Sequence, residues 1–255
     1  MRGLLREAGP PALFVALLVA AWELWARRSD DPNPVLPAPS KIWRAFLDTA
    51  HLLPDHLAAT LTETALGVVL GVAAGVVSAV VVSGSSLARR VLQPLLVVSQ
   101  TVPVQVLAPL LVLWTGFGLL PKIIVVALVV YFPVAVATAG GLQGVDPELV
   151  ELVRSFGAGR AVLLRMVMIP AALPGLFSGL RISLTYAVAG AVIGETIGAQ
   201  RGLGLYLARS QRAFRYDQVF VGVIVIALLS VALFSLVSVL ARVSCPWQRR
   251  PDRST

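Results

Sequence analysis

The chain has 255 residues, of which 57% are hydrophobic and 13% are charged, and its mean hydropathy is +0.85. A soluble domain carries about 25% charged residues, so the composition excludes a soluble globular protein and indicates an integral membrane protein. The formal net charge of +8 is expected for loops beside anionic lipid, and we predict no nucleic-acid partner. The single cysteine, Cys245, excludes a disulfide within the chain.

Six apolar runs are about as long as the ~20 residues that an α-helix needs to cross a bilayer. We predict membrane helices at about 10–27, 62–83, 91–114, 122–141, 172–196 and 218–242. The connections leave no room for a separate soluble domain. The sequence therefore predicts one all-α polytopic domain over residues 1–255, with its core at about 57–243.

The first run allows two interpretations. Arg2 and Arg6 before an apolar stretch that ends near Ala21 would fit a signal peptide. The run continues through Trp22 and Trp25, which fit the aromatic belt of a membrane interface. We therefore favour a retained first helix.

Several polar side chains interrupt the third and fifth predicted helices. Polar groups inside a membrane are costly and usually face protein or a water-filled cavity. They are candidates for a translocation path, and those of the third helix would equally suit packing between helices. The candidates are Ser99, Gln100, Gln105, Tyr186 and Glu195.

The segment at 146–170 has more helix-forming chemistry than a simple connection needs. Asp146 is a good N-cap, and Pro147 suits the first helical position. Apolar residues recur at helical spacing up to Phe156, and Gly157 predicts the end of this helix. A second short helix at about 161–168 follows. The loop would suit a docking surface for another protein or an amphipathic segment lying on lipid headgroups.

Other functional classes find little support. A secondary transporter or channel, kept as the alternative, predicts ionisable relays or inverted repeats, whereas Glu23, Arg181 and Glu195 lie near predicted membrane ends. His51 and His56 do not have zinc-protease spacing, so we predict no metal site and no enzyme. Neither lysine of the chain follows the glycine pattern of a P-loop. The chain therefore has no P-loop with which to bind and hydrolyse ATP itself.

The 146–170 loop resembles the EAA loop of ABC importer permeases. That pattern is Glu-Ala-Ala, three residues, Gly, nine residues and Ile-x-Leu-Pro. Here Glu151-Leu152-Val153 is followed by three residues, Gly157, nine residues and Val167-Met168-Ile169-Pro170. The two alanines are replaced by Leu152 and Val153, which keep the positions apolar.

The resemblance extends over most of the chain. Residues 36–43, 103–118, 173–181 and 194–204 contain motifs similar to those of nitrate, sulfonate and taurine permeases. Residues 177–183 and 190–195 are similar to permeases for thiamine-pyrimidine precursors or riboflavin. The resemblance implies the type I importer permease fold and a path for a small anionic or heteroaromatic solute.

The resemblance also implies partners and a location. Two ATPase subunits would bind ATP and Mg²⁺, and each would receive one loop, so this chain would need no cofactor of its own. A binding protein would deliver the solute, and a second permease, identical or homologous, would complete the path. The coupling residues would be Glu151, Leu152, Val153, Arg154, Phe156, Gly157 and Pro170. The chain would lie in a bacterial inner membrane, with both termini in the cytoplasm.

Loop charges give this orientation weak support, since twelve of the 21 Lys and Arg residues would lie inside and nine outside. Three of the outer arginines, Arg209, Arg212 and Arg215, recur at three-residue spacing. They would contact lipid phosphates, or they would attract an acidic lobe of the binding protein or an anionic solute.

Overall fold

The computed structural model describes residues 2–28, 34–99 and 101–248, and helices account for nearly all of them. In chain order the helices are α1 Arg2–Ala26, α2 Pro39–Thr49, α3 Leu53–Gly84, α4 Ser86–Ser99, α5 Val104–Thr115, α6 Leu120–Gln143, α7 Pro147–Ser155, α8 Arg160–Leu163, a π-helical turn Leu164–Met168, α9 Ile169–Thr196, α10 Leu203–Arg212, α11 Tyr216–Ser244 and a 3₁₀ turn Pro246–Gln248. The predicted all-α class is confirmed for these residues.

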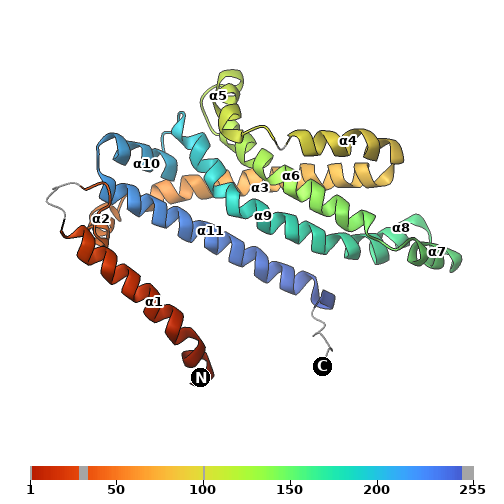
Figure 1. The fold of residues 1–255 in the computed structure, drawn as a ribbon. Coiled ribbons are helices and arrows are strands. Elements are labelled where there is room, and N and C mark those ends of the chain that lie inside the picture. The colour runs from red at the N-terminus through yellow and green to blue at the C-terminus, as the bar shows by residue number, and fades with distance from the viewer. Residues whose placement is uncertain (1, 29–33, 100, 249–255) are drawn as a thin grey trace.

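Helices α3, α6 and α9 form the centre of the bundle, and α11 runs along α9 (Figure 1). Glycines let α3 approach α6 closely, because a Cβ added at Gly71 would lie only 2.6 Å from the carbonyl oxygen of Ala127. Gly67 and Gly75 meet the valines of α6 in the same way. Small residues of this kind permit backbone contact between membrane helices. The small-residue face of α3 is therefore used within the chain.

Among the described residues, five helical stretches are long and apolar enough to cross a membrane: Gly9–Ala26, Leu53–Gly84, Leu120–Gln143, Ala161–Thr196 and Tyr216–Ser244. The predicted third membrane helix at 91–114 is wrong as one element, because α4 and α5 are separate and Thr101–Pro103 is not helical. Pro103 has no backbone N–H to donate and disfavours helical geometry in the residue before it. The shorter α5, Val104–Thr115, is nevertheless apolar.

Two other boundaries differ from the prediction. The second predicted helix begins at Leu53 instead of residue 62, with Pro54 in its first turn, so Glu63 lies well inside α3. Short helices α2 and α10 form in segments that we expected to be loops. Both pack against α11.

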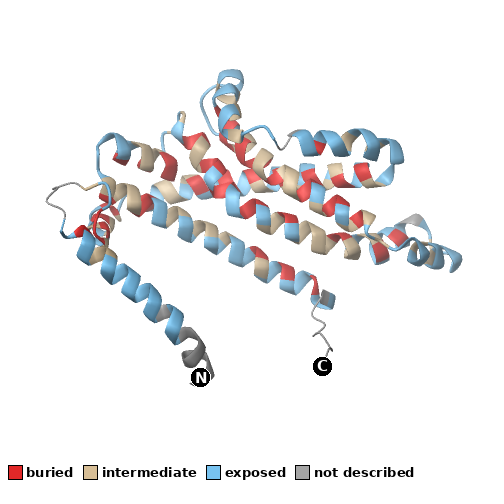
Figure 2. Cartoon of the chain, viewed as in Figure 1, coloured by how far each residue is buried: buried red, intermediate tan, exposed pale blue. Residues whose placement is uncertain are grey.

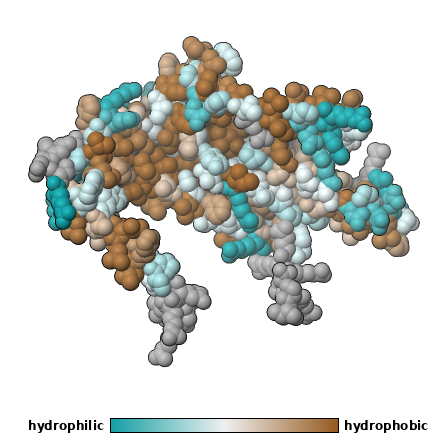
Figure 3. All heavy atoms as spheres, viewed as in Figure 1, coloured by the Kyte–Doolittle hydropathy of each residue, from teal (hydrophilic) through white to brown (hydrophobic). Residues whose placement is uncertain are grey.

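The bundle has two distinct ends, with α7 and α8 at one and α2 and α10 at the other (Figure 1). Burial concentrates where the central helices meet, whereas α1 and α7 are largely exposed (Figure 2). The surface is apolar over the middle of the bundle, and hydrophilic residues gather over α7–α8, over α4 and over α10 (Figure 3). This pattern is the one expected of a bundle that spans a bilayer.

Candidate functional site

The 146–170 loop folds as its sequence predicts. Asp146 has extended backbone angles, and its side chain accepts a hydrogen bond of 2.9 Å from the Glu148 N–H. Gly157 has a φ of +79°, which favours glycine, and its N–H donates to the Arg154 carbonyl at 2.9 Å. The predicted start and end of α7 are thereby confirmed. A short α8 and the π-helical turn then lead into α9, with Pro170 in the first turn of α9.

The tip of this loop presents apolar side chains that the chain itself leaves uncovered. Phe156 is 82% exposed, and Leu149 and Leu152 are also exposed. Val153 is half-buried, and Glu151 and Arg154 are exposed on the same helix. A contiguous exposed apolar patch with a charged rim is typical of a surface that contacts another protein or a membrane. Most of the residues predicted for coupling are therefore accessible on α7 or at its end, whereas Pro170 is half-buried in the first turn of α9.

A pocket beside α6 brings together two residues predicted for the translocation path. Gln105 of α5 and Tyr186 of α9 both line this side pocket, whose volume is about 370 Å³. The other lining residues are apolar: Val102, Pro103, Val104, Leu128, Val129, Phe132, Pro133, Ala189, Gly190 and Ile193. Tyr186 is 60% exposed, so the pocket is open on one side. A mostly apolar cavity with a few polar groups is the usual form of a small-molecule site.

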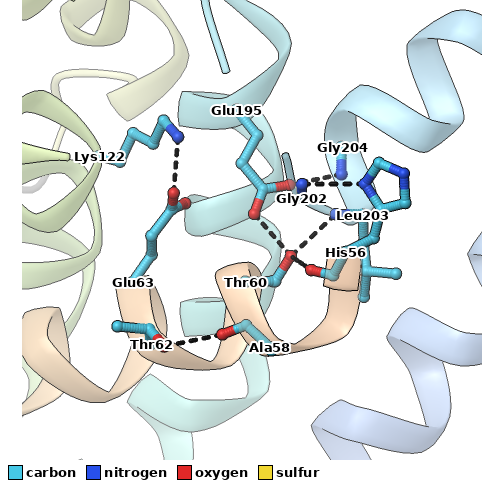
Figure 4. Close-up of polar contacts among 10 residues, drawn as sticks. All are labelled: His56, Ala58, Thr60, Thr62, Glu63, Lys122, Glu195, Gly202, Leu203 and Gly204. Carbon is cyan, nitrogen blue, oxygen red and sulfur yellow. Dashed lines mark hydrogen bonds and ion pairs between the residues drawn. The ribbon is translucent and has the colours of Figure 1, made fainter. Parts of the chain in front are cut away.

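The remaining path candidates lie elsewhere. Ser99 is the last residue of α4, and Gln100 lies outside the described residues. Glu195 is fully buried and does not line the side pocket. Its Oε1 accepts a hydrogen bond of 2.6 Å from Thr60 Oγ1, and its Oε2 accepts one from the Gly204 N–H (Figure 4). We therefore assign Glu195 to internal packing and not to the path.

Glu195 belongs to a buried polar cluster that we had not expected. We define this cluster as His56, Thr60 and Glu63 of α3, Lys122 of α6, Glu195 of α9 and the backbone of residues 202–204 (Figure 4). Lys122 Nζ lies 2.6 Å from Glu63 Oε1, and both side chains are buried. The cluster thus joins three core helices to the start of α10.

Backbone groups before and within α10 complete the cluster. The Leu203 N–H donates to Thr60 Oγ1 at 2.9 Å, and the Gly202 N–H donates to His56 Nδ1 at 3.0 Å. Gly202 has a φ of +133°, and a Cβ there would lie 2.2 Å from the Glu195 carboxyl carbon. No other residue type would fit this close approach.

One sequence signal could have revealed part of this cluster. Thr60, Glu63 and Gly67 recur at three- and four-residue spacing, so they share one face of a helix. We had started this helix at residue 62, which placed Glu63 at a membrane end. Lys122 carried no comparable signal, because its counter-ion lies 59 positions away in the sequence.

The three predicted outer arginines lie at the end of the bundle opposite α7. Arg209 and Arg212 are exposed on α10. Arg215 is exposed as well, and its Nε lies 3.3 Å from Oδ1 of the buried Asp217. The basic stripe is therefore accessible, although one member is held by an ion pair.

Long apolar helices, an exposed capped loop at one end and an open pocket beside the core define a polytopic membrane protein of the transport class. Residues 67–250 match the family described as binding-protein-dependent transport system inner membrane component, and the chain belongs to this family. It is a permease subunit of an ABC importer for small solutes.

Relatives with known names span nearly the whole chain. A probable ABC transporter permease protein of Haemophilus influenzae is 37% identical over 224 residues, covering 88% of this chain and 91% of the relative. The formylaminopyrimidine transport permease protein ThiX of Halalkalibacterium halodurans is 34% identical over 245 residues, covering 96% and 98%. The taurine transport system permease protein TauC of Escherichia coli is 31% identical over 240 residues, covering 91% and 87%.

Solved structures show the same fold. A chain from inward-facing conformations of the MetNI methionine ABC transporter superposes with a TM-score of 0.60 at 21% identity, covering 76% of this chain and 95% of that one. A chain from an amino acid ABC transporter gives a TM-score of 0.59 at 22% identity, covering 77% and 97%. The predicted importer permease fold is therefore confirmed.

Proposed function

We propose that the side pocket is this subunit's part of the translocation path. The observation that carries the proposal is that Gln105 and Tyr186, which are far apart in the sequence, line one cavity. A path for a solute needs polar groups that the protein does not saturate internally. Gln105 and Tyr186 are exposed at the pocket, so both can contact a passing solute.

The lining of the pocket favours a small heteroaromatic solute over an anion. Tyr186 and Phe132 offer aromatic surfaces for stacking, and the Gln105 amide can both donate and accept hydrogen bonds. None of the described residues that line the pocket is charged. ThiX and the riboflavin transport permease RibX of Chloroflexus aurantiacus are named for heteroaromatic compounds, formylaminopyrimidine and riboflavin. These names support a heteroaromatic solute.

The open side of the pocket is where we place a second permease subunit. Nearby α5 exposes large apolar side chains, including Val106, Leu113 and Trp114. A second copy or a homologous permease that covers this face would remove apolar surface from lipid contact and close the pocket into a path. The translocation path is then formed between two subunits.

The 146–170 loop is the proposed docking site of the ATPase subunits. Its exposed Phe156 and Leu152 would enter an apolar groove, and Glu151 and Arg154 would orient the loop at the rim. Two ATPases, each binding ATP and Mg²⁺, would serve two permeases. This arrangement places α7 and both chain termini on the cytoplasmic side of the inner membrane.

The opposite end is then extracytoplasmic and would receive a solute-binding protein. Arg209, Arg212 and Arg215 would attract acidic residues of that partner, since complementary charge steers association. The binding protein would make most of the selection among solutes. Thermal-shift screening of that protein with pyrimidine precursors, flavins, sulfonates and nitrate identifies the transported compound.

Uptake by reconstituted complexes tests the path. We expect Gln105→Ala and Tyr186→Ala each to raise the half-saturating solute concentration or lower the rate by roughly three- to tenfold, because each removes one contact of about 1 kcal/mol. Gln93→Ala is the matched control, since Gln93 is an exposed glutamine of α4 outside the side pocket. Unchanged uptake by both path variants would contradict the proposal.

A further inference from the structure

The buried polar cluster contains a carboxyl oxygen without a donor. Glu63 Oε1 receives the Lys122 ammonium at 2.6 Å. Glu63 Oε2 is buried, and among the described residues no group donates a hydrogen bond to it. Buried polar atoms nearly always have a partner, because an unsatisfied one has lost its hydrogen bonds to water without replacing them. The missing donor therefore requires an explanation.

The nearest candidate is the carboxyl group of Glu195. The Glu63 and Glu195 carboxyl groups face each other within the cluster, and a hydrogen bond between them requires that one of them carry a proton (Figure 4). Two ionised carboxylates have no donor to share and repel each other, most strongly when water is excluded. A single proton between them would supply the donor that Oε2 lacks.

The charge balance of the cluster favours the same conclusion. Two carboxylates and one ammonium carry a net charge of −1, and one added proton makes the group neutral. Burial of an uncompensated charge is far more costly than burial of a neutral, fully hydrogen-bonded group. Glu195 has its remaining contacts in place, with Thr60 and with the Gly204 N–H.

The other titratable or charged groups around the pair do not supply this proton. His56 Nδ1 accepts from the Gly202 N–H, which requires that nitrogen to be unprotonated. Burial raises the pKa of the Tyr206 phenol, whose hydroxyl lies 3.0 Å from Thr49 Oγ1. Arg201 is exposed at the mouth of a neighbouring pocket. Lys122 is held by the other oxygen of Glu63.

We propose that Glu63 and Glu195 form a proton-binding site. One shared proton links their two carboxyl groups and thereby holds residues 202–204 and α10 against α3 and α6. A second pocket of about 430 Å³ reaches the site, since it is lined by Glu63 and Lys122 and also by the exposed Gln200 and Arg201. Protons from the aqueous side at the α10 end can therefore reach the pair. The occupancy of this proton site therefore depends on the pH of that aqueous side, whichever solute is carried.

The sign of the pH effect follows from proton counting. Above pH ~4.3 a glutamate of the unfolded chain loses its proton, whereas the folded pair keeps the shared one. The folded state then binds more protons than the unfolded state, so stability falls as pH rises. The unfolding constant increases by up to tenfold per pH unit until the folded pair releases its proton.

Thermal unfolding of the full chain in lipid nanodiscs, without solute, tests this site separately from the translocation path. Between about pH 5 and pH 9, spanning the region above the ordinary glutamate range, we expect the wild type to lose stability with pH. Glu195→Gln should lose that dependence, because its amide donates to Glu63 without titrating. Thr60 can then donate to the His56 carbonyl, which lies 3.1 Å away.

Glu148→Gln is the matched control, since Glu148 is exposed on α7 and should follow the wild type. His56→Asn keeps an acceptor for the Gly202 N–H and removes the imidazole, so a pH slope that it retains belongs to the glutamate pair. Equal pH slopes in the wild type and in Glu195→Gln would overturn the proposal.

Infrared spectroscopy tests the proton directly, even if a variant fails to fold. We expect the wild type to show the C=O stretching band of a buried protonated carboxylic acid, shifted in D₂O and lost at alkaline pH. The band should be absent from Glu195→Gln and unchanged in Glu148→Gln. A wild-type spectrum that lacks a titrating carboxylic acid band would refute the shared proton.

Discussion

The two ends of this permease are built in opposite ways. The 146–170 loop is made of contiguous residues, its helix caps are local, and its apolar tip is left exposed with Phe156 at 82%. The buried polar cluster at the other end draws residues from 56 to 204 into one enclosed network. The loop leaves its apolar tip uncovered by the chain, whereas the cluster is buried among side chains and backbone groups of the chain itself.

This contrast predicts which changes damage folding and which damage only function. Removing one member of a buried ion pair leaves an uncompensated charge and costs about 3–5 kcal/mol. Removing an exposed apolar side chain changes folding by less than about 0.5 kcal/mol. Variants at the two ends therefore separate stability from transport activity.

The largest effect on stability is expected for Lys122→Met. It leaves Glu63 buried without its counter-ion, so we expect a loss of about 3–5 kcal/mol, measured by thermal unfolding in detergent. The double variant Glu63→Gln with Lys122→Met should recover most of that loss. Arg27→Met is the surface control, because Arg27 is largely exposed in its pair with Glu23, and it should cost less than about 1 kcal/mol. Equal losses at the two pairs would break the comparison.

Phe156→Asp should leave folding intact and abolish transport coupling. The charge would enter the apolar contact proposed for the ATPase, so we expect solute uptake driven by ATP to fall at least tenfold while the melting temperature stays unchanged. Uptake and ATP hydrolysis in proteoliposomes measure the coupling. Phe156→Leu keeps an apolar side chain and should retain most of the activity. Wild-type uptake by Phe156→Asp would remove the loop from the coupling mechanism.

The smallest effect is expected at the basic stripe of α10. Arg209→Glu combined with Arg212→Glu should weaken docking of the binding protein by roughly three- to tenfold at low salt, and the difference should shrink as salt screens the charges. Both arginines are exposed on α10, whereas Arg215 is paired with the buried Asp217. Arg89→Glu combined with Arg90→Glu makes the same charge change at two exposed arginines of α4 and should have no effect on docking. A docking affinity that ignores both the reversal and the salt concentration would assign the stripe to lipid contact.

The parts of the structure that were predictable depend on neighbours in the sequence. Asp146 caps α7 through Glu148, two residues away, and Gly157 ends the helix because its own backbone adopts a positive φ. The apolar runs around residues 122–141 and 218–242 are long enough to predict membrane helices from their length alone. Each of these features follows from local backbone chemistry or from transfer of side chains into lipid.

One error had a local cause, and the other arose where distant residues decide the outcome. The break at Thr101–Pro103 could be read from proline chemistry, but apolar composition alone suggested one continuous helix. Glu195 was expected in the path because a polar residue in a membrane usually faces a cavity. Its carboxyl group instead accepts hydrogen bonds from Thr60 and from the Gly204 N–H. No local sequence pattern predicts these contacts.

The sequence by itself determined the membrane class, most of the spanning helices and the capped 146–170 loop, because each rests on periodicity, length or caps within a short stretch. Tertiary structure alone decided that Gln105 and Tyr186 share a pocket and that Glu63, Lys122 and Glu195 share a buried network. The physical reason is that a buried charge requires a compensating partner, and packing of α3 against α6 and α9 selects that partner.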